Sequence, residues 1–173
     1  FHHIGDLDPF TTGVAGLLAD DGVFVIEVPH ALELVELNEF DGVYHEHVSQ
    51  MTVKSFVDHF RQFDLQVFDV ERLDIHGGSM RVFARPARGD ASVPAAVQKW
   101  IDQEAERGLF EAKTYDAFRS RVEGIRVDLM KLLRQLKSEG KRIAGYGASA
   151  RGNTLLNYYG IGIDILDYIV DRN

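Results

Sequence analysis

The sequence predicts an α/β protein made of two parts that follow one another along the chain. Residues 22–29, "GVFVIEVP", form an apolar, β-branched run between helical patterns, as a buried strand does. Residues 65–75 and 79–86 are two further strand candidates, joined by the short segment "HGG". Residues 141–173 contain a strand, a glycine-rich turn, a helix and another strand. We therefore expect an open sheet that ends in an antiparallel pair, followed by a small α/β domain.

The elements of the first part follow from hydrophobic periodicity. Residues 7–20 have apolar side chains at helical spacing, which predicts a helix that ends at "DDG". A short helix, "ALELVEL", is expected to follow the first strand. Residues 52–63 predict a helix with Thr52 as its N-cap. Its apolar face consists of Val53, Phe56, Val57 and Phe60. The final strand is expected to be inserted antiparallel, an ending that is typical of class I S-adenosylmethionine methyltransferases.

The second part begins after a polar stretch near residues 87–93, so we place the domains at 1–89 and 90–173. Residues 95–109 and 114–140 predict two helices, the second of which is capped by Gly140. The strand, glycine-rich turn, helix and strand that follow predict a small Rossmann-like domain.

Composition excludes several classes of protein. The net charge of −8 lacks the basic face that non-specific nucleic-acid binding needs. The chain has no cysteine, which excludes disulfides and cysteine zinc sites and is compatible with a reducing compartment. Its apolar runs are too short to cross a bilayer. We expect a cytoplasmic protein without nucleic-acid or membrane partners, and composition does not predict its oligomeric state.

The stretch "YHEH", residues 44–47, admits three interpretations. A metal site needs a third and a fourth ligand, and no second cluster with ligand spacing is evident, so we predict no metal here. An acid–base site needs an imidazole and a carboxylate to orient it, and both are present. The third interpretation is a solvated surface loop. On a helical turn Tyr44 and His47 would share a face, whereas on an extended segment His45 and His47 would do so.

The stretch "GYGASARGN", residues 145–153, follows a strand and opens a helix, where backbone amides can bind phosphate. Its glycine spacing is not G-x-G-x-x-G, and it lacks the Lys-Ser/Thr pair of a P-loop. Ser149 and Arg151 would add donors to an anion. The alternative is a tight turn that only needs glycine. "HGGSMR", residues 76–81, is similarly either an anion-facing turn or, as we favour, a hairpin connection.

Four blocks in one order carry a family resemblance: "HIGDL", "EVPHALELVELNEFDGVYHEHVS", "DVERLDIHGGSMR" and "GYGASARGNTLLNYYGI…IVDRN". Together they resemble the sugar C-methyltransferases, which use S-adenosylmethionine to methylate nucleotide-linked keto-deoxysugars. The resemblance implies three parts: a cysteine-rich zinc domain, a methyltransferase domain and a C-terminal domain that helps to hold the nucleotide sugar. We expect this chain to be a fragment without the zinc domain and without the main cofactor-binding loop, so zinc is expected only in that missing domain and the fragment alone is expected to be inactive.

The resemblance also implies site residues. Tyr44, Glu46 and His47 match the active-site pattern of the family, and His3 matches an upstream histidine better than His2 does. Methylation of a carbon beside a ketone requires a base and an enolate stabiliser. The resemblance implies that His47 is the base, that Glu46 orients or polarises an imidazole, and that Tyr44 and His3 donate hydrogen bonds to the enolate or position the sugar.

In the second half, the resemblance implies contact with the nucleotide diphosphate, and the candidate residues are Gly147, Ser149, Arg151 and Asn153. Two other functions stay open at this point. One is a module that binds a dinucleotide or CoA-type cofactor through the glycine-rich turn, and the other is a non-catalytic interaction domain.

Overall fold

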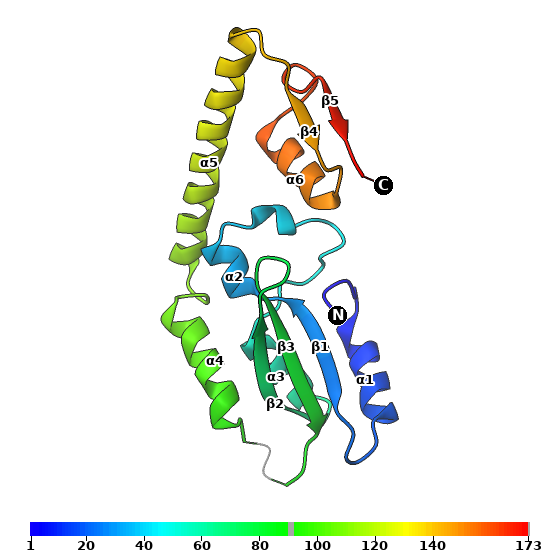
Figure 1. Ribbon diagram of the computed structural model, residues 1–173. Helices are drawn as coiled ribbons and strands as arrows, with labels where there is room; N and C mark the ends of the chain where they lie inside the picture. The colour runs from blue at the N-terminus through cyan, green and yellow to red at the C-terminus, as the bar shows by residue number, and fades with distance from the viewer. Residues whose placement is uncertain (90–91, 173) are drawn as a thin grey trace.

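The computed structural model describes residues 1–89 and 92–172, and it has the α/β architecture that the sequence predicts. Figure 1 shows an elongated molecule with a three-stranded sheet and its helices at one end and a small βαβ unit at the other. The long helix α5 (Ala112–Ser138) runs beside the βαβ unit. Residues 90 and 91, at the predicted domain boundary, lie outside the described residues.

The sheet has the strand order β1-β3-β2, with β1 at Phe24–Pro29, β2 at Leu65–Leu73 and β3 at Ser79–Pro86. The last strand, β3, lies between the other two and pairs antiparallel with both. This confirms the predicted insertion of an antiparallel final strand. Because β1 and β2 therefore run in the same direction, both end at the same edge of the sheet.

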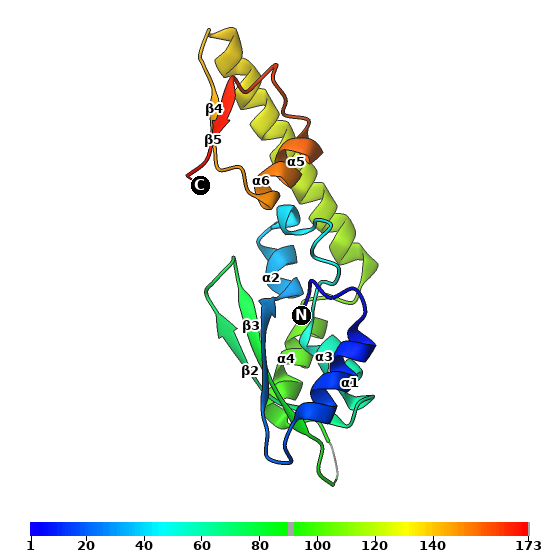
Figure 2. The same cartoon turned by 90° about the vertical axis from the view of Figure 1, so that its right-hand side faces the viewer.

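Three helices cover one face of this sheet: α1 (Leu7–Leu17), α3 (Val53–Arg61) and α4 (Ala95–Glu106) (Figure 2). The four apolar residues predicted to share a face of α3 are all buried, and Thr52 caps the helix in a reciprocal pair of hydrogen bonds with Ser55. Val28, Val82 and Ala84 supply the sheet side of the same core. On the opposite face, Arg81 bonds to Glu27 of the neighbouring strand, as expected for a solvated surface.

Helix α4 follows the predicted boundary in sequence but packs against the first core. Its Val97 is fully buried in the cluster formed by the sheet and α3, and Trp100 and Ile101 lie against that cluster. The division at residues 89 and 90 stays a prediction, and α4 makes an extensive contact across it.

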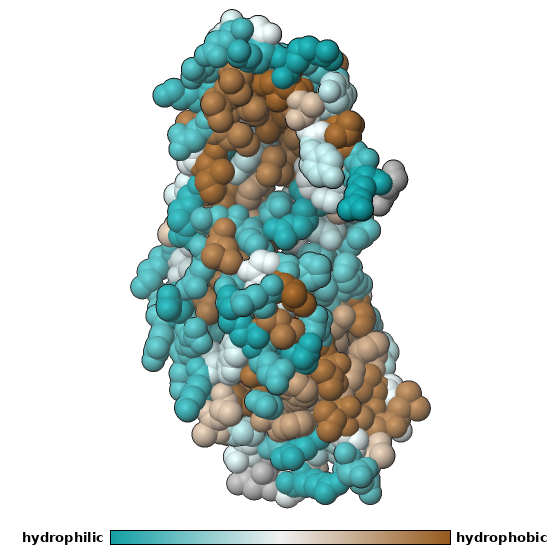
Figure 3. Space-filling view, in the orientation of Figure 1, coloured by the Kyte–Doolittle hydropathy of each residue, from teal (hydrophilic) through white to brown (hydrophobic). Residues whose placement is uncertain are grey.

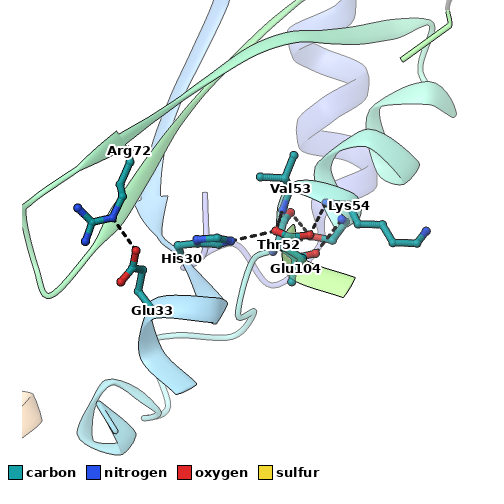
Figure 4. Close-up of polar contacts among 8 residues, drawn as sticks. His30, Glu33, Thr52, Val53, Lys54, Arg72 and Glu104 are labelled. Carbon is teal, nitrogen blue, oxygen red and sulfur yellow. Dashed lines mark hydrogen bonds and ion pairs between the residues drawn. The ribbon is translucent and has the colours of Figure 1, made fainter. Parts of the chain in front are cut away.

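A buried carboxylate fixes α4 in place. Glu104 of α4 is completely buried, and its Oε1 accepts hydrogen bonds from the backbone amide of Val53 and from Nε2 of His30, the latter at 2.9 Å (Figure 4). Its Oε2 accepts from the amide of Lys54 at 3.1 Å. The two amides belong to the first turn of α3, where a negative charge is favoured by the helix dipole. One side chain thus joins α4, α3 and the residue that follows β1.

The small unit consists of β4 (Ala144–Tyr146), α6 (Ala150–Tyr159) and β5 (Tyr168–Val170), and its two strands are parallel. This confirms the predicted strand–helix–strand order, while a wider Rossmann-like domain stays a prediction. Gly140 has a positive φ of 75° just beyond α5, and the amides of Gly140 and Lys141 bond to the carbonyls of Lys137 and Leu136. Figure 3 shows apolar side chains gathered where α5 meets this unit.

Between the two ends lie α2 (Ala31–Glu36) and a short 3₁₀ helix, η1 (Phe40–Gly42) (Figure 1). The ring of Phe40 packs against Tyr158 and Tyr159 of α6, with ring centroids 5.3 and 5.0 Å apart. This contact packs the end of α6 against the segment that precedes "YHEH". In the described ranges 1–89 and 92–172, no helix combines the length and apolar composition needed to span a bilayer.

Replacing Glu104 is expected to destabilise the fold strongly. Glu104→Ala leaves His30 and two helix amides buried without their acceptor, and breaking a buried pair costs about 3–5 kcal/mol. Urea unfolding followed by circular dichroism measures this loss. Glu106→Ala, at an exposed position of the same helix, is the matched control and should change stability by less than about 0.5 kcal/mol. Equally small losses of unfolding free energy in both variants would contradict the conclusion that Glu104 stabilises the fold.

Candidate active site

A pocket of about 370 Å³ lies at the sheet edge where β1 and β2 end. Its lining comes from the N-terminal segment, the end of β1, α2, the loop of residues 39–50, the β2–β3 turn and the first turn of α6. The pocket is large enough for a small ligand. Its position outside the carboxyl ends of parallel strands is the one that open α/β sheets use for binding.

The "YHEH" segment forms a turn that separates its four side chains into two pairs. The His47 amide bonds to the Tyr44 carbonyl at 2.9 Å, and the rings of Tyr44 and His47 lie 4.1 Å apart between centroids. Both side chains line the pocket. The side chains of His45 and Glu46 project outwards and are 88% and 56% exposed. The structure therefore favours the arrangement in which Tyr44 and His47 share a side.

The tautomer of His47 is set by a backbone carbonyl. Nδ1 of His47 lies 2.7 Å from the carbonyl oxygen of Gly42, which accepts a hydrogen bond and so requires the proton to be on Nδ1. In the neutral ring, Nε2 then carries the free electron pair. A histidine held in this way can accept a proton or coordinate a metal ion.

Two further imidazoles adjoin His47. The ring centroid of His2 lies 4.5 Å from that of His47, and the ring centroid of His3 lies 5.0 Å away. His2 is half-buried and His3 is exposed. Burial, and then the charges of His3 and His47, lower the pKa of His2 from 6.5 to about 4. His2 is therefore uncharged near neutral pH, because adding a proton there is opposed by both desolvation and repulsion.

Arg151, from the first turn of α6, reaches the same pocket from the second half of the chain. Its guanidinium donates to both carboxylate oxygens of Asp41, at 3.0 and 2.8 Å, and lies 3.5 Å from Glu39. The hydrogen bonds with Asp41 raise the pKa of Arg151. Arg151 thus shares the pocket with Tyr44 and His47.

Comparison with known proteins shows the family of this chain. Residues 74–173, more than half of the chain, match the family described as C-methyltransferase C-terminal domain. The chain is also 41% identical over 162 residues to C-methyltransferase NovU of Streptomyces niveus, in an alignment that covers 94% of this chain and 39% of that protein. This chain belongs to the C-methyltransferase family. The predicted resemblance is thereby confirmed at the level of the family. The chain spans well under half the length of NovU, so it represents one part of what a C-methyltransferase of that length contains.

The pocket does not bring all of the predicted residues together. Tyr44, His47, His3 and Arg151 line it, and Glu46 does not. Glu46 lies 3.9 Å from exposed His45, and the orientation of His47 comes from the Gly42 carbonyl. The predicted role of Glu46 in orienting an imidazole is therefore not visible in this geometry, and it stays a prediction.

The glycine-rich turn contributes Arg151 to the pocket lining, but not Gly147, Ser149 or Asn153. Gly147 has a φ of 101°, and its amide donates to the carbonyl of Val170 at 2.8 Å. The Ser149 hydroxyl caps α6 by accepting from the Gly152 amide. Another amide of the turn, that of Ala148, donates to Asp171. Several donors expected to bind phosphate are thus engaged within the protein. Diphosphate contacts by Gly147, Ser149 and Asn153 stay predictions.

Sequence reasoning missed three histidines of the pocket: His2, His30 and His76. His30 directly follows Pro29 at the end of β1, and a polar residue at the carboxyl end of a parallel-type strand is a signal for a site. His76 lies in the β2–β3 turn with a φ of 50°, which a bulky residue rarely adopts. This turn is the hairpin connection that the sequence favoured, and it also lines the pocket.

Protonation of His2 is expected to require acid. In metal-free buffer, the ring of His2 should stay neutral until the pH approaches about 4, as followed by NMR of its ring nitrogens. Since the unfolded chain binds this proton at 6.5, the folded state loses stability as the pH falls from 6.5 to about 4. His47→Gln removes a repelling neighbour and should raise the pKa of His2. A His2 titration near 6.5 in both proteins would contradict this picture.

Proposed function

We propose that this chain forms part of a C-methyltransferase that transfers a methyl group from S-adenosylmethionine to a carbon beside a ketone in a nucleotide-diphosphate-linked deoxysugar. The observation that carries the proposal is the pairing, in one pocket, of a histidine with a fixed tautomer and an arginine from the other half of the chain. The first group suits proton removal from carbon, and the second suits binding of a phosphate.

In this proposal His47 is the base. A proton on carbon next to a ketone leaves only if a base is aimed at it and if the resulting enolate oxygen is stabilised. The Gly42 carbonyl holds Nδ1 of His47, so that Nε2 is the nitrogen that accepts the proton. Tyr44 and His3, beside it in the pocket, are the candidate donors to the enolate oxygen.

S-adenosylmethionine supplies an electrophilic methyl group when it is bound. The pocket lining matches such a cation only in its apolar part: Pro29 and Leu34 offer apolar surface, whereas the Glu27 carboxylate is already paired with Arg81. The residues of this chain would place the sugar and take up its α-proton, so that the enolate carbon could accept the methyl group while S-adenosylhomocysteine leaves.

Arg151 is the proposed ligand of the diphosphate. A nucleotide sugar is long, so its phosphates lie away from the reacting carbon while the sugar reaches the imidazoles. In the structure the guanidinium is held by Asp41 and Glu39, which keep it at the pocket before any anion arrives. Two carboxylates on one guanidinium also leave a negative charge in excess, so binding of a diphosphate requires Arg151 to turn from them or to bridge them to the ligand.

Loss of His47 is expected to abolish most of the chemistry. In the full-length protein, His47→Gln should slow methyl transfer by about 10²–10⁴-fold, while the affinity for S-adenosylmethionine should stay unchanged. The same variant should slow exchange of the substrate α-hydrogen with deuterium from solvent, which reports on proton removal alone. Mass spectrometry of the sugar measures both.

His45→Gln is the matched control for this test. His45 lies two residues from His47 in the same turn and is exposed. It should retain nearly all activity and exchange. A comparably large loss in His45→Gln, or near-normal exchange in His47→Gln, would remove His47 from the role of base.

Loss of Arg151 is expected to weaken substrate binding. Charge-assisted hydrogen bonds to an anion are worth roughly 1.5–3 kcal/mol, so Arg151→Ala should raise KM for the nucleotide sugar by about 10–100-fold. Turnover at saturation should fall less, because the same contact exists in the ground state and the transition state. Steady-state kinetics separates the two constants.

Arg142→Ala is the control for the loss of a positive charge in the same unit. Arg142 is 82% exposed and pairs with Asp167, outside the pocket lining. Its removal should leave KM unchanged. If Arg151→Ala changes neither constant, the ion pair with Asp41 is a structural contact and the phosphate assignment fails.

A further inference from the structure

Three imidazoles meet at the mouth of the pocket. His2, His3 and His47 each offer one ring nitrogen, and these three nitrogens all lie within 4.8 Å of one another. Their rings are mutually close, with His2 and His3 at 4.2 Å between centroids. No metal was predicted because "YHEH" lacked a third and a fourth ligand. Folding brings two imidazoles, His2 and His3, to His47 from a segment more than forty residues away.

The individual nitrogens have the chemistry of ligands. Nε2 of His47 carries the free electron pair because Nδ1 donates to the Gly42 carbonyl, and metal-binding histidines are commonly oriented through such a bond from the other nitrogen. Nδ1 of His2 is buried and has no hydrogen-bond partner among the described residues. Buried polar atoms normally have a hydrogen-bond partner or a bound ion. A metal ion would supply the partner that this nitrogen lacks. His3 is exposed, which leaves a path by which an ion can enter.

The ligand set selects the kind of ion. Three imidazoles suit Zn²⁺ and Co²⁺, whereas Mg²⁺ and Ca²⁺ require oxygen ligands, and the group contains no carboxylate. Three protein ligands on a tetrahedral ion leave a fourth position for water or another small ligand.

We propose that His2, His3 and His47 form a binding site for one divalent ion of the Zn²⁺ type at the mouth of the pocket. An imidazole whose electron pair is on a metal cannot accept a proton. His47 therefore cannot bind the ion and act as a base at the same time. This consequence rests on the proposed function, whereas the binding of the metal ion does not. Zn²⁺ would then act as an inhibitor that binds where the substrate carbon is deprotonated.

The test is a titration of the tag-free chain, freed of metal by dialysis, with Zn²⁺ in a calorimeter. We expect one Zn²⁺ per chain. His47→Gln should weaken binding by at least about 10–100-fold, the loss that even an indirect partner of a metal ligand causes. His45→Gln, the exposed neighbour, should bind like the original chain. Visible spectra with Co²⁺ should show the strong bands of a tetrahedral site and lose them in His47→Gln.

Zn²⁺ and Co²⁺ are preferred as probes to Cu²⁺ and Ni²⁺. The last two favour planar nitrogen sites, which a free amino terminus followed by His2 and His3 can supply without His47. Binding that survives His47→Gln would show such terminal chelation and overturn the proposal. Binding well below one ion per chain would also overturn it.

Two further measurements keep the test decisive. If His47→Gln fails to fold, as judged by circular dichroism, NMR of the original chain decides instead. Zn²⁺ should then shift the ring signals of His2, His3 and His47 but not those of His45. Since neither measurement involves a methyl donor or a sugar, failure of metal binding leaves the proposed methyl transfer untouched, and the reverse also holds.

Discussion

The buried carboxylate of Glu104 is the interaction on which the arrangement of the pocket depends. It is fully buried, and its partners are His30 and the first two amides of α3. Taking a charge out of water is costly, so this carboxylate persists only because several donors converge on it. Their convergence fixes where α4 lies and where the residue after β1 lies. That residue, His30, lines the pocket, so the position of part of the lining depends on a side chain from beyond the predicted domain boundary.

The opposite wall of the pocket depends on a second charged contact. Arg151 bonds to Asp41, and Phe40 packs on the two tyrosines at the end of α6. The first contact is polar and exchangeable, whereas the second is apolar and persistent. This division is compatible with the proposed role of Arg151, because the ring contacts would hold the two halves together if the guanidinium turned to a phosphate.

The imidazole cluster combines two properties that compete. The free electron pair on Nε2 of His47 can accept a proton, and together with one nitrogen each of His2 and His3 it also makes a ligand set for Zn²⁺. The backbone carbonyl of Gly42 serves both outcomes, because it fixes which nitrogen of His47 is available. A C-methyltransferase that used His47 as a base would accordingly be sensitive to free zinc.

Local sequence determined the elements and much of their order. The apolar spacing of α3, the Thr52 cap, the glycine after α5 and the hairpin of β2 and β3 were all predicted, because each depends on neighbours within a few residues. Four ordered motifs also identified the family, and with it Tyr44, His47, His3 and Arg151, all of which line the pocket.

The tertiary structure decided which polar groups meet. His2 joined the cluster, Glu46 turned outwards, and Glu104 became buried, although each lies in a stretch whose local pattern is compatible with the opposite outcome. Glu104 occupies an otherwise polar helix, and only the approach of α3 and His30 supplies the donors that make its burial favourable. Such contacts join residues about 50 to 74 positions apart, and no periodicity within one segment encodes them, because their energy exists only when the segments are packed together.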